Sequence, residues 1–106
     1  MKPVVFLGDS LGRIRAFPDG MRRTAGYQLE RVQRGFDPDD WKPMTSIGEG
    51  VREIRVRDTS GAYRVIYVAS FRDAVYVLHA FQKKAQRTPG PVLKLAMTRL
   101  KELKRR

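Results

Sequence analysis

The sequence contains no cysteine and only one histidine, His79. Without cysteine the chain cannot form disulfides, zinc ribbons, iron–sulfur centres or thiol nucleophiles. A single histidine excludes a two-histidine nuclease site and most transition-metal sites built within one chain. We therefore expect neither a metal ion nor another cofactor, and a chemistry that depends on the remaining polar side chains.

Long apolar segments are also missing. The apolar run from Pro3 to Leu7 is too short for the hydrophobic region of a signal peptide. No stretch approaches the roughly 18 apolar residues that a membrane-spanning helix needs. With 106 residues, 42% of them hydrophobic, the chain has the size of one small domain, residues 1–106, with a modest core. These features predict a cytoplasmic protein without a membrane partner.

Acidic residues are few compared with basic ones. Eleven Asp and Glu stand against 22 Lys and Arg, which gives a formal net charge of +11. The segment from Gln82 to Arg106 contains nine of the basic residues and one acidic residue, Glu102, so most of the excess lies there. A surplus of this size predicts a polyanionic partner, either nucleic acid or an acidic protein.

The spacing of apolar residues predicts a small α+β domain with the order β-αα-βββ-α. The predicted elements are, in chain order, a strand at 3–7, helices at 9–17 and 19–34, a loop at 36–50, strands at 51–57, 62–69 and 74–81, and a helix after Pro89. Asp9 or Ser10 is expected to cap the first helix and Asp19 the second. The last strand is almost entirely apolar, which favours a central position covered on both faces.

One short motif suggests a hydrolase. The sequence Leu7-Gly8-Asp9-Ser10-Leu11 resembles the nucleophile block of GDSL-type esterases. That family supplies its base from an Asp-x-x-His motif, but here Tyr76 stands three residues before His79. The chain is also about half as long as such a hydrolase. We therefore interpret Asp9 or Ser10 as a helix cap and reject the esterase.

Arginines on neighbouring strands are a more informative signal. Arg52, Arg55, Arg57 and Arg64 lie on two strands joined by a tight turn, so several of them are expected to share one face of the sheet. Like charges repel, and a fold tolerates their proximity more readily when an anion binds between them. The alternative is a solvated sheet face on which Glu53 and Asp58 pair with the arginines.

His79 lies late in the third of these strands, next to the basic segment 82–87. A lone histidine in an apolar strand is most often a half-buried packing residue. Its position beside basic residues also fits a group that moves a proton near neutral pH while arginines hold a phosphodiester.

Four segments together resemble the RelE/HigB toxins, and most of all the phage-derived, HigB-like branch of that superfamily. These segments are Val51–Arg57 (VREIRVR), Gly61–Tyr67 (GAYRVIY), Val77–Lys84 (VLHAFQKK) and Gln86–Pro89 (QRTP). The resemblance implies a RelE-like α+β fold with a mostly antiparallel sheet and the helices packed on one face. It also implies the toxin of a prokaryotic type II toxin–antitoxin system, acting as a metal-independent mRNA endoribonuclease on translated mRNA.

The resemblance further implies roles for individual residues. Arg64 corresponds to the arginine that contacts the scissile phosphate, and Arg55, His79 and Lys83 match the other catalytic positions. RNA binding is expected from Arg52, Arg57, Lys84 and Arg87. The expected partners are mRNA, the ribosome and a cognate antitoxin, expected to be a helix-turn-helix protein. Glu53 stands where RelE has a lysine, and no equivalent of the C-terminal catalytic tyrosine is found.

Two other functions are compatible with the same residues. A ParE-like toxin of the same superfamily poisons DNA gyrase without cleaving RNA, although such proteins lack the Arg64 and His79 constellation. A basic module that binds RNA or protein without catalysis is the second alternative. DNA damage in expressing cells would indicate the first, and salt-dependent RNA binding without product would indicate the second.

Overall fold

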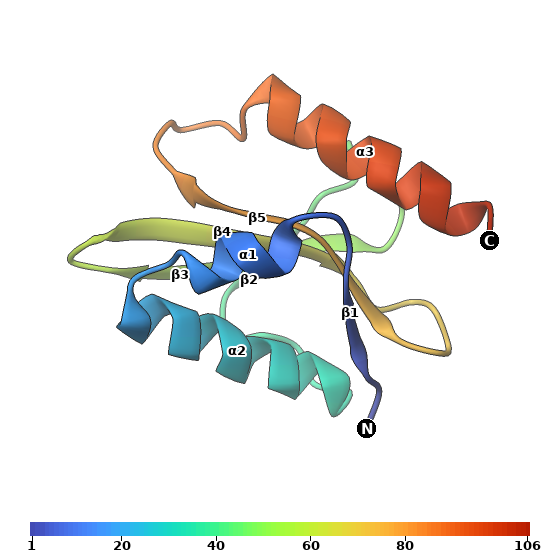
Figure 1. The fold of residues 1–106 in the computed structure, drawn as a ribbon, viewed down its shortest axis with the longest axis horizontal. Helices are drawn as coiled ribbons and strands as arrows, with labels where there is room; N and C mark the ends of the chain where they lie inside the picture. Colours follow the sequence, from blue (N-terminus) through green and yellow to red (C-terminus); the bar gives the residue numbers. More distant parts are fainter.

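The computed structural model describes residues 1–106 and contains one five-stranded sheet and three helices (Figure 1). The strands are β1 (Val4–Phe6), β2 (Trp41–Pro43), β3 (Val51–Asp58), β4 (Gly61–Val68) and β5 (Val75–Lys83), in the sheet order β1-β5-β4-β3-β2. The helices are α1 (Ser10–Arg15), α2 (Asp19–Gln33) and α3 (Gly90–Lys104). Only β1 pairs parallel with its neighbour. The predicted α+β fold with a mostly antiparallel sheet is confirmed.

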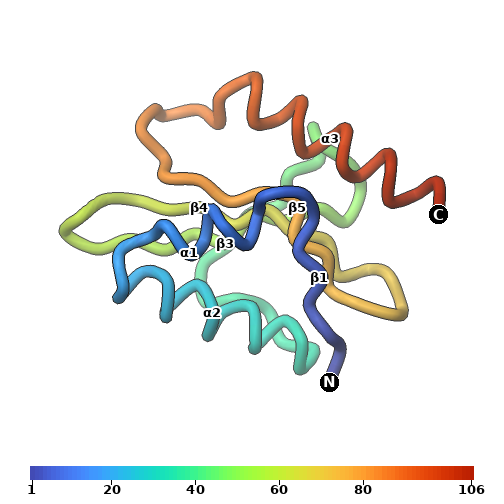
Figure 2. Tube along the Cα trace, in the orientation of Figure 1, coloured from blue at the N-terminus to red at the C-terminus, as the bar shows by residue number.

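The amino-acid composition of the central strands β4 and β5 explains their extended backbone. Both are rich in β-branched and aromatic residues, which favour extended backbone, and both are buried over most of their length. A tight turn joins β3 to β4: Asp58 Oδ1 accepts a hydrogen bond from the Ser60 amide at 2.8 Å, and Gly61 adopts a φ of +145° that other residues avoid. Figure 2 shows this turn at the end of the molecule opposite the two chain termini.

The helices cover both faces of the sheet, not one as expected. The first face packs against α1 and α2, with Ile14 and Leu29 meeting Ile54 and Val65. The opposite face packs against α3, whose Ala96, Leu100 and Leu103 meet residues such as Ile66 and Val68. The reason lies in β4 and β5: their alternating residues are apolar on both sides, so one layer of helices would leave the other side in water.

The segment predicted as a loop contains a strand. Residues Trp41–Pro43 form β2, which pairs antiparallel with β3 at the edge of the sheet. Three residues are too few to produce a recognisable alternation, and Pro43 argues against a strand except at a sheet edge. The sequence alone therefore does not reveal β2, which is defined by its hydrogen bonds to β3.

The helix N-termini also differ from the prediction that aspartate or serine side chains cap them. Asp9 occupies the N-cap position of α1 but makes no capping hydrogen bond, and Ser10 donates instead to the Val77 carbonyl at 3.3 Å. Asp19 is already the first residue of α2, after Pro18. The carboxylates of both aspartates bind arginines, which competes with capping. None of the three helices has the length and apolar character needed to cross a bilayer.

Candidate functional site: a cationic cluster beside a buried ion pair

Strand register aligns charged side chains in rows across the sheet. Directly opposite residues share a face, and Ile66 and Val68 place this face on the α3 side. The rows are Arg57–Ala62–Lys83, Arg55–Arg64–Phe81 and Lys42–Glu53–Ile66–His79. Four strands therefore contribute polar side chains to one surface, near the β3–β4 turn.

Five basic residues from these rows form what we call the cationic cluster. Its members are Lys42 of β2, Arg55 and Arg57 of β3, Arg64 of β4 and Lys83 of β5. The three arginines, together with Asp40, line a hollow of about 190 Å³. Cations so close together repel one another unless an anion lies among them.

A buried ion pair anchors the centre of the cluster. Arg64 Nε lies 3.4 Å from Glu53 Oε1, and the two side chains are 7% and 0% exposed. Arg64 Nη1 also donates to the Tyr63 carbonyl at 3.0 Å, while Thr88 Oγ1 donates to Glu53 Oε2 at 3.4 Å. Burial lowers the pKa of the Arg64 guanidinium; Glu53 opposes this effect and Arg55 adds to it. Glu53 thus holds Arg64 in place and ties the 84–89 segment to the sheet.

Lys83 differs electrostatically from the arginines around it. Burial lowers the pKa of its ammonium group, and the nearby charges of Arg64 and Lys42 lower it further, while Glu53 acts in the opposite direction. Removing a proton from Lys83 is easier here than in water because it relieves this repulsion. Lys83 is therefore the member of the cationic cluster best suited to accept a proton.

His79 shares the face of the cationic cluster but is not open to solvent. Its side chain is buried (3% exposed) and its ring stacks on Phe81, with the ring centres 6.0 Å apart. Arg99 of α3 covers it, with Nη1 3.3 Å from His79 Nδ1. Burial lowers the pKa of His79, and the charges of Arg99 and Arg13 lower it further.

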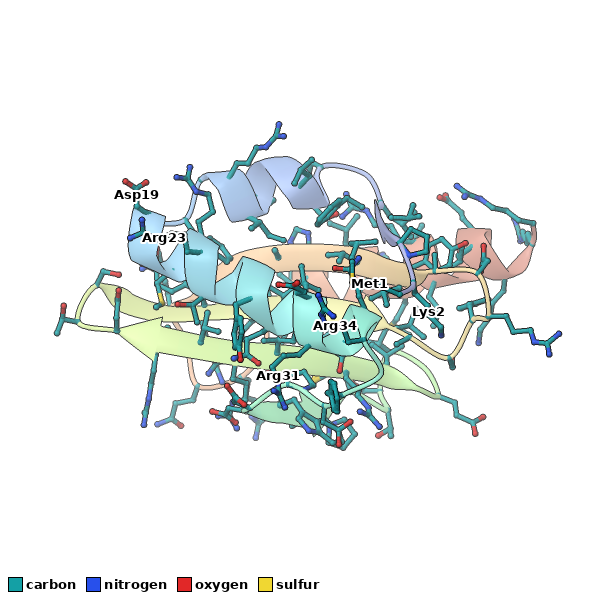
Figure 3. All side chains as sticks on the ribbon, turned by 90° about the horizontal axis from the view of Figure 1, so that it is seen from below. Met1, Lys2, Asp19, Arg23, Arg31 and Arg34 are labelled. Carbon is teal, nitrogen blue, oxygen red and sulfur yellow. The ribbon has the colours of Figure 1, made fainter.

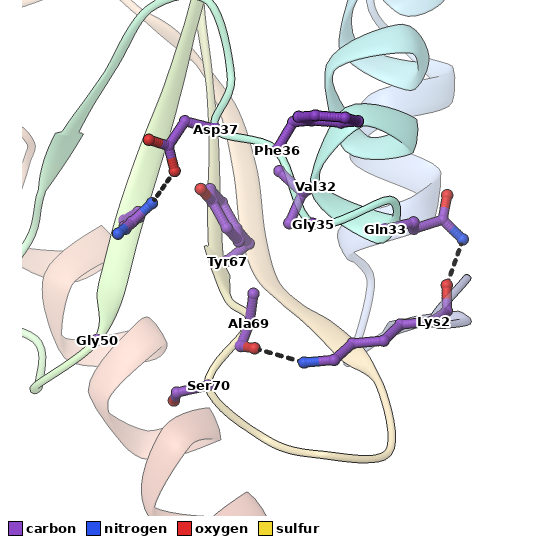
Figure 4. Close-up of a pocket in the computed structure, with 11 residues that line it drawn as sticks. Lys2, Val32, Gln33, Gly35, Phe36, Asp37, Gly50, Tyr67, Ala69 and Ser70 are labelled. Carbon is purple, nitrogen blue, oxygen red and sulfur yellow. Dashed lines mark hydrogen bonds and ion pairs between the residues drawn. The ribbon is translucent and has the colours of Figure 1, made fainter.

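The structure separates Arg52 from the other strand arginines. Arg52 lies on the α2 side, where it stacks over Trp41 at 4.0 Å and donates to Asp37 at 2.8 Å. It lines a pocket of about 320 Å³ with Tyr67, and Figure 4 shows Tyr67 beside Asp37 in that pocket. The sequence already contained the reason: Arg52 is three residues from Arg55, and an odd offset in a strand reverses the face.

The two remaining predicted RNA-binding residues lie on different sides of β5. Arg87 lines a groove of about 370 Å³ together with Lys42, Thr45 and Ser46. Because Lys42 belongs to both, this groove continues from the cationic cluster. Lys84 lies instead in a hollow beside α1, with Arg13 among its neighbours.

Further arginines lie on α2, away from the cationic cluster. Figure 3 looks onto this helix and shows Arg23, Arg31 and Arg34 on its outer side. Arg34 pairs with Glu30 at 3.1 Å and Arg31 with Asp39 at 3.6 Å. Ion pairs at an exposed surface contribute little stability, so this part of the excess charge is a solvated face.

Three residues of the site were not identified as functional from the sequence. Lys42 falls in the predicted loop 36–50, Glu53 is expected only as an ion-pair partner in the alternative of a solvated face, and Arg99 lies in the basic segment after Pro89. The strand alternation that placed Arg55 and Arg57 together also places Glu53 with them, so that signal was present. Lys42 and Arg99 reach the site only through the β2–β3 pairing and the packing of α3.

The arrangement has the chemistry of a phosphate site. Arg55 and Arg64 stand directly opposite each other on neighbouring strands, so a phosphate between them would contact two guanidinium groups. No group of three or more histidine, aspartate or glutamate side chains is placed to hold a metal ion.

The sequence matches the model of a known protein family. The model of the family described as "Phage derived protein Gp49-like (DUF891)" matches residues 13–101. No curated protein matches the sequence. The matched range extends from α1 into the last part of α3, and it contains every member of the cationic cluster.

Proposed function

This chain belongs to the Gp49-like family of phage-derived proteins, and from that premise we propose that it is the toxin of a type II toxin–antitoxin system and cleaves mRNA. The observation that carries the proposal is the cationic cluster. Five cations from four strands surround a single buried carboxylate, and two of them, Arg55 and Arg64, face each other across neighbouring strands. An RNA phosphate would complement this charge pattern.

The proposed reaction uses a nucleophile that RNA itself carries. The ribose 2′-oxygen attacks phosphorus and the P–O5′ bond breaks, which leaves a 2′,3′-cyclic phosphate and a 5′-hydroxyl. Arg55 and Arg64 stabilise the extra negative charge on the phosphorane, because their guanidinium groups are already in place before the charge develops.

Two proton transfers accompany this attack. The 2′-hydroxyl loses a proton as the O2′–P bond forms, and O5′ gains one as the P–O5′ bond breaks. We assign the first transfer to Lys83, whose lowered pKa favours the neutral amine that accepts a proton. The second is assigned to His79, which lies on the same face of the sheet. His79 can give this proton only as an imidazolium, so the transfer requires Arg99 to release Nδ1.

Nucleotides beside the cleaved bond have a path across the surface. The groove lined by Lys42, Thr45, Ser46 and Arg87 continues from the cationic cluster, and none of its lining residues is acidic. Arg57 extends the cluster toward the β3–β4 turn in the other direction. A single strand lying along this line would keep its phosphates near basic side chains.

The expected partners follow from the same surface. Translated mRNA at the ribosome is the proposed substrate, and an antitoxin with an acidic segment would neutralise the basic face. Both are consistent with the net charge of +11.

Arg64→Ala tests the proposal directly. Primer extension on a defined mRNA in a purified translation system should show sharp new 5′ ends with the wild-type protein. Arg64→Ala should cleave about 100- to 1,000-fold more slowly, since losing one preorganised donor costs this much in rate. The matched control is Arg23→Ala, which removes one exposed cation from the outer side of α2 and should cleave like the wild type.

The same assay separates the proposed function from its alternatives. Omitting ribosomes shows whether cleavage depends on them. Intact mRNA in every lane, including the wild type, would contradict the proposal, and DNA damage in expressing cells would then point to a gyrase poison. Salt-dependent RNA binding without product would point to a binding module.

A further inference from the structure

Arg99 contacts two segments that lie far from it and from each other in the sequence. Its Nη2 donates to Asp9 Oδ1 at 2.8 Å, in the turn between β1 and α1. Its Nη1 donates to the Leu78 carbonyl at 2.7 Å and lies 3.3 Å from His79 Nδ1. One guanidinium from α3 therefore connects the β1–α1 turn, the backbone of β5 and the only histidine of the chain.

The chemistry of these groups determines where the proton of His79 lies. An arginine guanidinium only donates hydrogen bonds, so the nitrogen facing it has to accept one. His79 Nδ1 therefore presents its lone pair to Arg99, and a neutral ring carries its proton on Nε2. A protonated ring would place an N–H against the N–H of Arg99, which is a repulsive contact.

Asp9 and Gly8 hold Arg99 in this position. Asp9 binds Arg99 and Arg13 together, and these two bonds lower the pKa of its carboxyl to about 2. Gly8 has a φ of +54°, and a Cβ atom at this position would collide with the Arg99 guanidinium. The Gly8-Asp9 turn thus provides both the space and the counter-charge that Arg99 requires.

We propose that Arg99, anchored by Asp9, is a positioning residue that keeps His79 neutral with its proton on Nε2. While this contact holds, His79 can donate a hydrogen bond but cannot take up a further proton at Nδ1. When Arg99 moves away, Nδ1 becomes free and the ring can carry the proton assigned to O5′. This consequence for cleavage rests on the proposed function, whereas the protonation state of His79 does not.

The charged groups around His79 support the same direction. Arg99 from α3 and Arg13 from α1 both lower its pKa, Asp9 raises it, and the residue opposite on β4 is the uncharged Ile66. Burial adds to the effect of the arginines. His79 is consequently expected to stay neutral to a lower pH than an exposed histidine.

Nitrogen-15 NMR of the wild-type protein tests the proposal directly. Because the chain has one histidine, a two-bond proton–nitrogen spectrum shows one imidazole pattern without assignment. The expected pattern is the Nε2–H tautomer at neutral pH, with protonation only below the usual pH for histidine. A wild-type spectrum with the proton on Nδ1 would overturn the proposal without any variant.

Two matched variants separate the hydrogen bond from the charge. Arg99→Met and Arg13→Met each remove one cation near His79, so both should raise its pKa. Only Arg99→Met also frees Nδ1, so only this variant should show a mixture of the two tautomers. The proposal is wrong if Arg99→Met keeps the pure Nε2–H pattern and shifts the pKa no more than Arg13→Met.

These measurements need no RNA cleavage. A wild-type protein that shows the expected tautomer but leaves mRNA intact would contradict the proposed function and support the role of Arg99. A protein that cleaves mRNA but carries the proton on Nδ1 would support the proposed function and contradict the role of Arg99.

Discussion

Glu53 and Arg64 show how one buried pair organises the site. Removing water from both charges costs several kcal/mol per ion, and their mutual attraction returns this only if the geometry is good. Arg64 donates a further hydrogen bond to the Tyr63 carbonyl, and Glu53 accepts one from Thr88. The pair is therefore better explained by the placement of Arg64 than by a contribution to stability.

Lys83 provides a prediction at the same scale. Lys42→Met should shift the rising limb of the pH–rate profile to higher pH, because Lys42 is one of the cations that lower the pKa of Lys83. With less repulsion, the Lys83 ammonium loses its proton at higher pH, and the neutral amine that accepts the 2′-hydroxyl proton appears later.

The measurement is single-turnover cleavage as a function of pH. Lys94→Met is the control, since Lys94 is exposed on α3 and its loss should leave the limb where the wild type has it. An unchanged limb in Lys42→Met would show that Lys83 is not the group that accepts the proton.

At the scale of elements, α3 has two separate tasks. Its apolar side, formed by Ala96, Leu100 and Leu103, covers the second face of the sheet. Its Arg99 reaches over that face to Asp9 and His79. The same face carries the cationic cluster at the end of the sheet near the β3–β4 turn.

Leu100→Ala tests the packing role of α3. Leu100 is 3% exposed in the core between α3 and the sheet. Its truncation should lower the free energy of unfolding by about 2–5 kcal/mol, since it removes buried methyl groups and leaves a cavity. Met97→Ala on the same helix, where the side chain is 46% exposed, should change it by less than about 1 kcal/mol. Urea unfolding of both variants measures the difference, and equal losses would contradict this assignment of the helix faces.

At the scale of the whole molecule, the net charge of +11 is unevenly distributed over the surface. Part of it lies on the outer side of α2, where Arg31 and Arg34 pair with acidic neighbours. The cationic cluster concentrates another part around one buried carboxylate, Glu53, with Asp40 at the edge of the hollow. Under the proposed function, long-range attraction would bring the RNA to the surface, and the cationic cluster would determine where it binds.

Salt dependence measures how many of these charges take part. Binding of a short RNA with 2′-O-methyl groups, which cannot be cleaved, should weaken linearly on a double logarithmic plot. The expected slope is about −0.7 for each phosphate contact, so a strand that makes one such contact with each of the five cations should give a slope of about −3.5.

Variants assign that slope to the cationic cluster. Arg64→Ala should make the slope less steep by about one phosphate contact, whereas Arg23→Ala should leave it unchanged. Equal slopes for all three proteins would contradict binding at the cationic cluster.

Local patterns were sufficient to predict much of the molecule. The apolar alternation of β3 to β5, the tight turn before Gly61 and the amphipathic pattern after Pro89 depend on neighbouring residues, so the strand and helix positions could be read from them. The grouping of Arg55, Arg57 and Arg64 followed from the same alternation. Applied more strictly, that alternation would also have placed Arg52 on the other face.

Long-range packing decided the rest. Which face α3 covers, the pairing of Trp41–Pro43 with β3, and the contact of Arg99 with His79 each join segments separated by many residues. No local pattern encodes such contacts, because they depend on which apolar surfaces remain uncovered after the hairpin has formed. The residue types available for chemistry are therefore a property of the sequence, while the neighbours and protonation of His79 are a property of the fold.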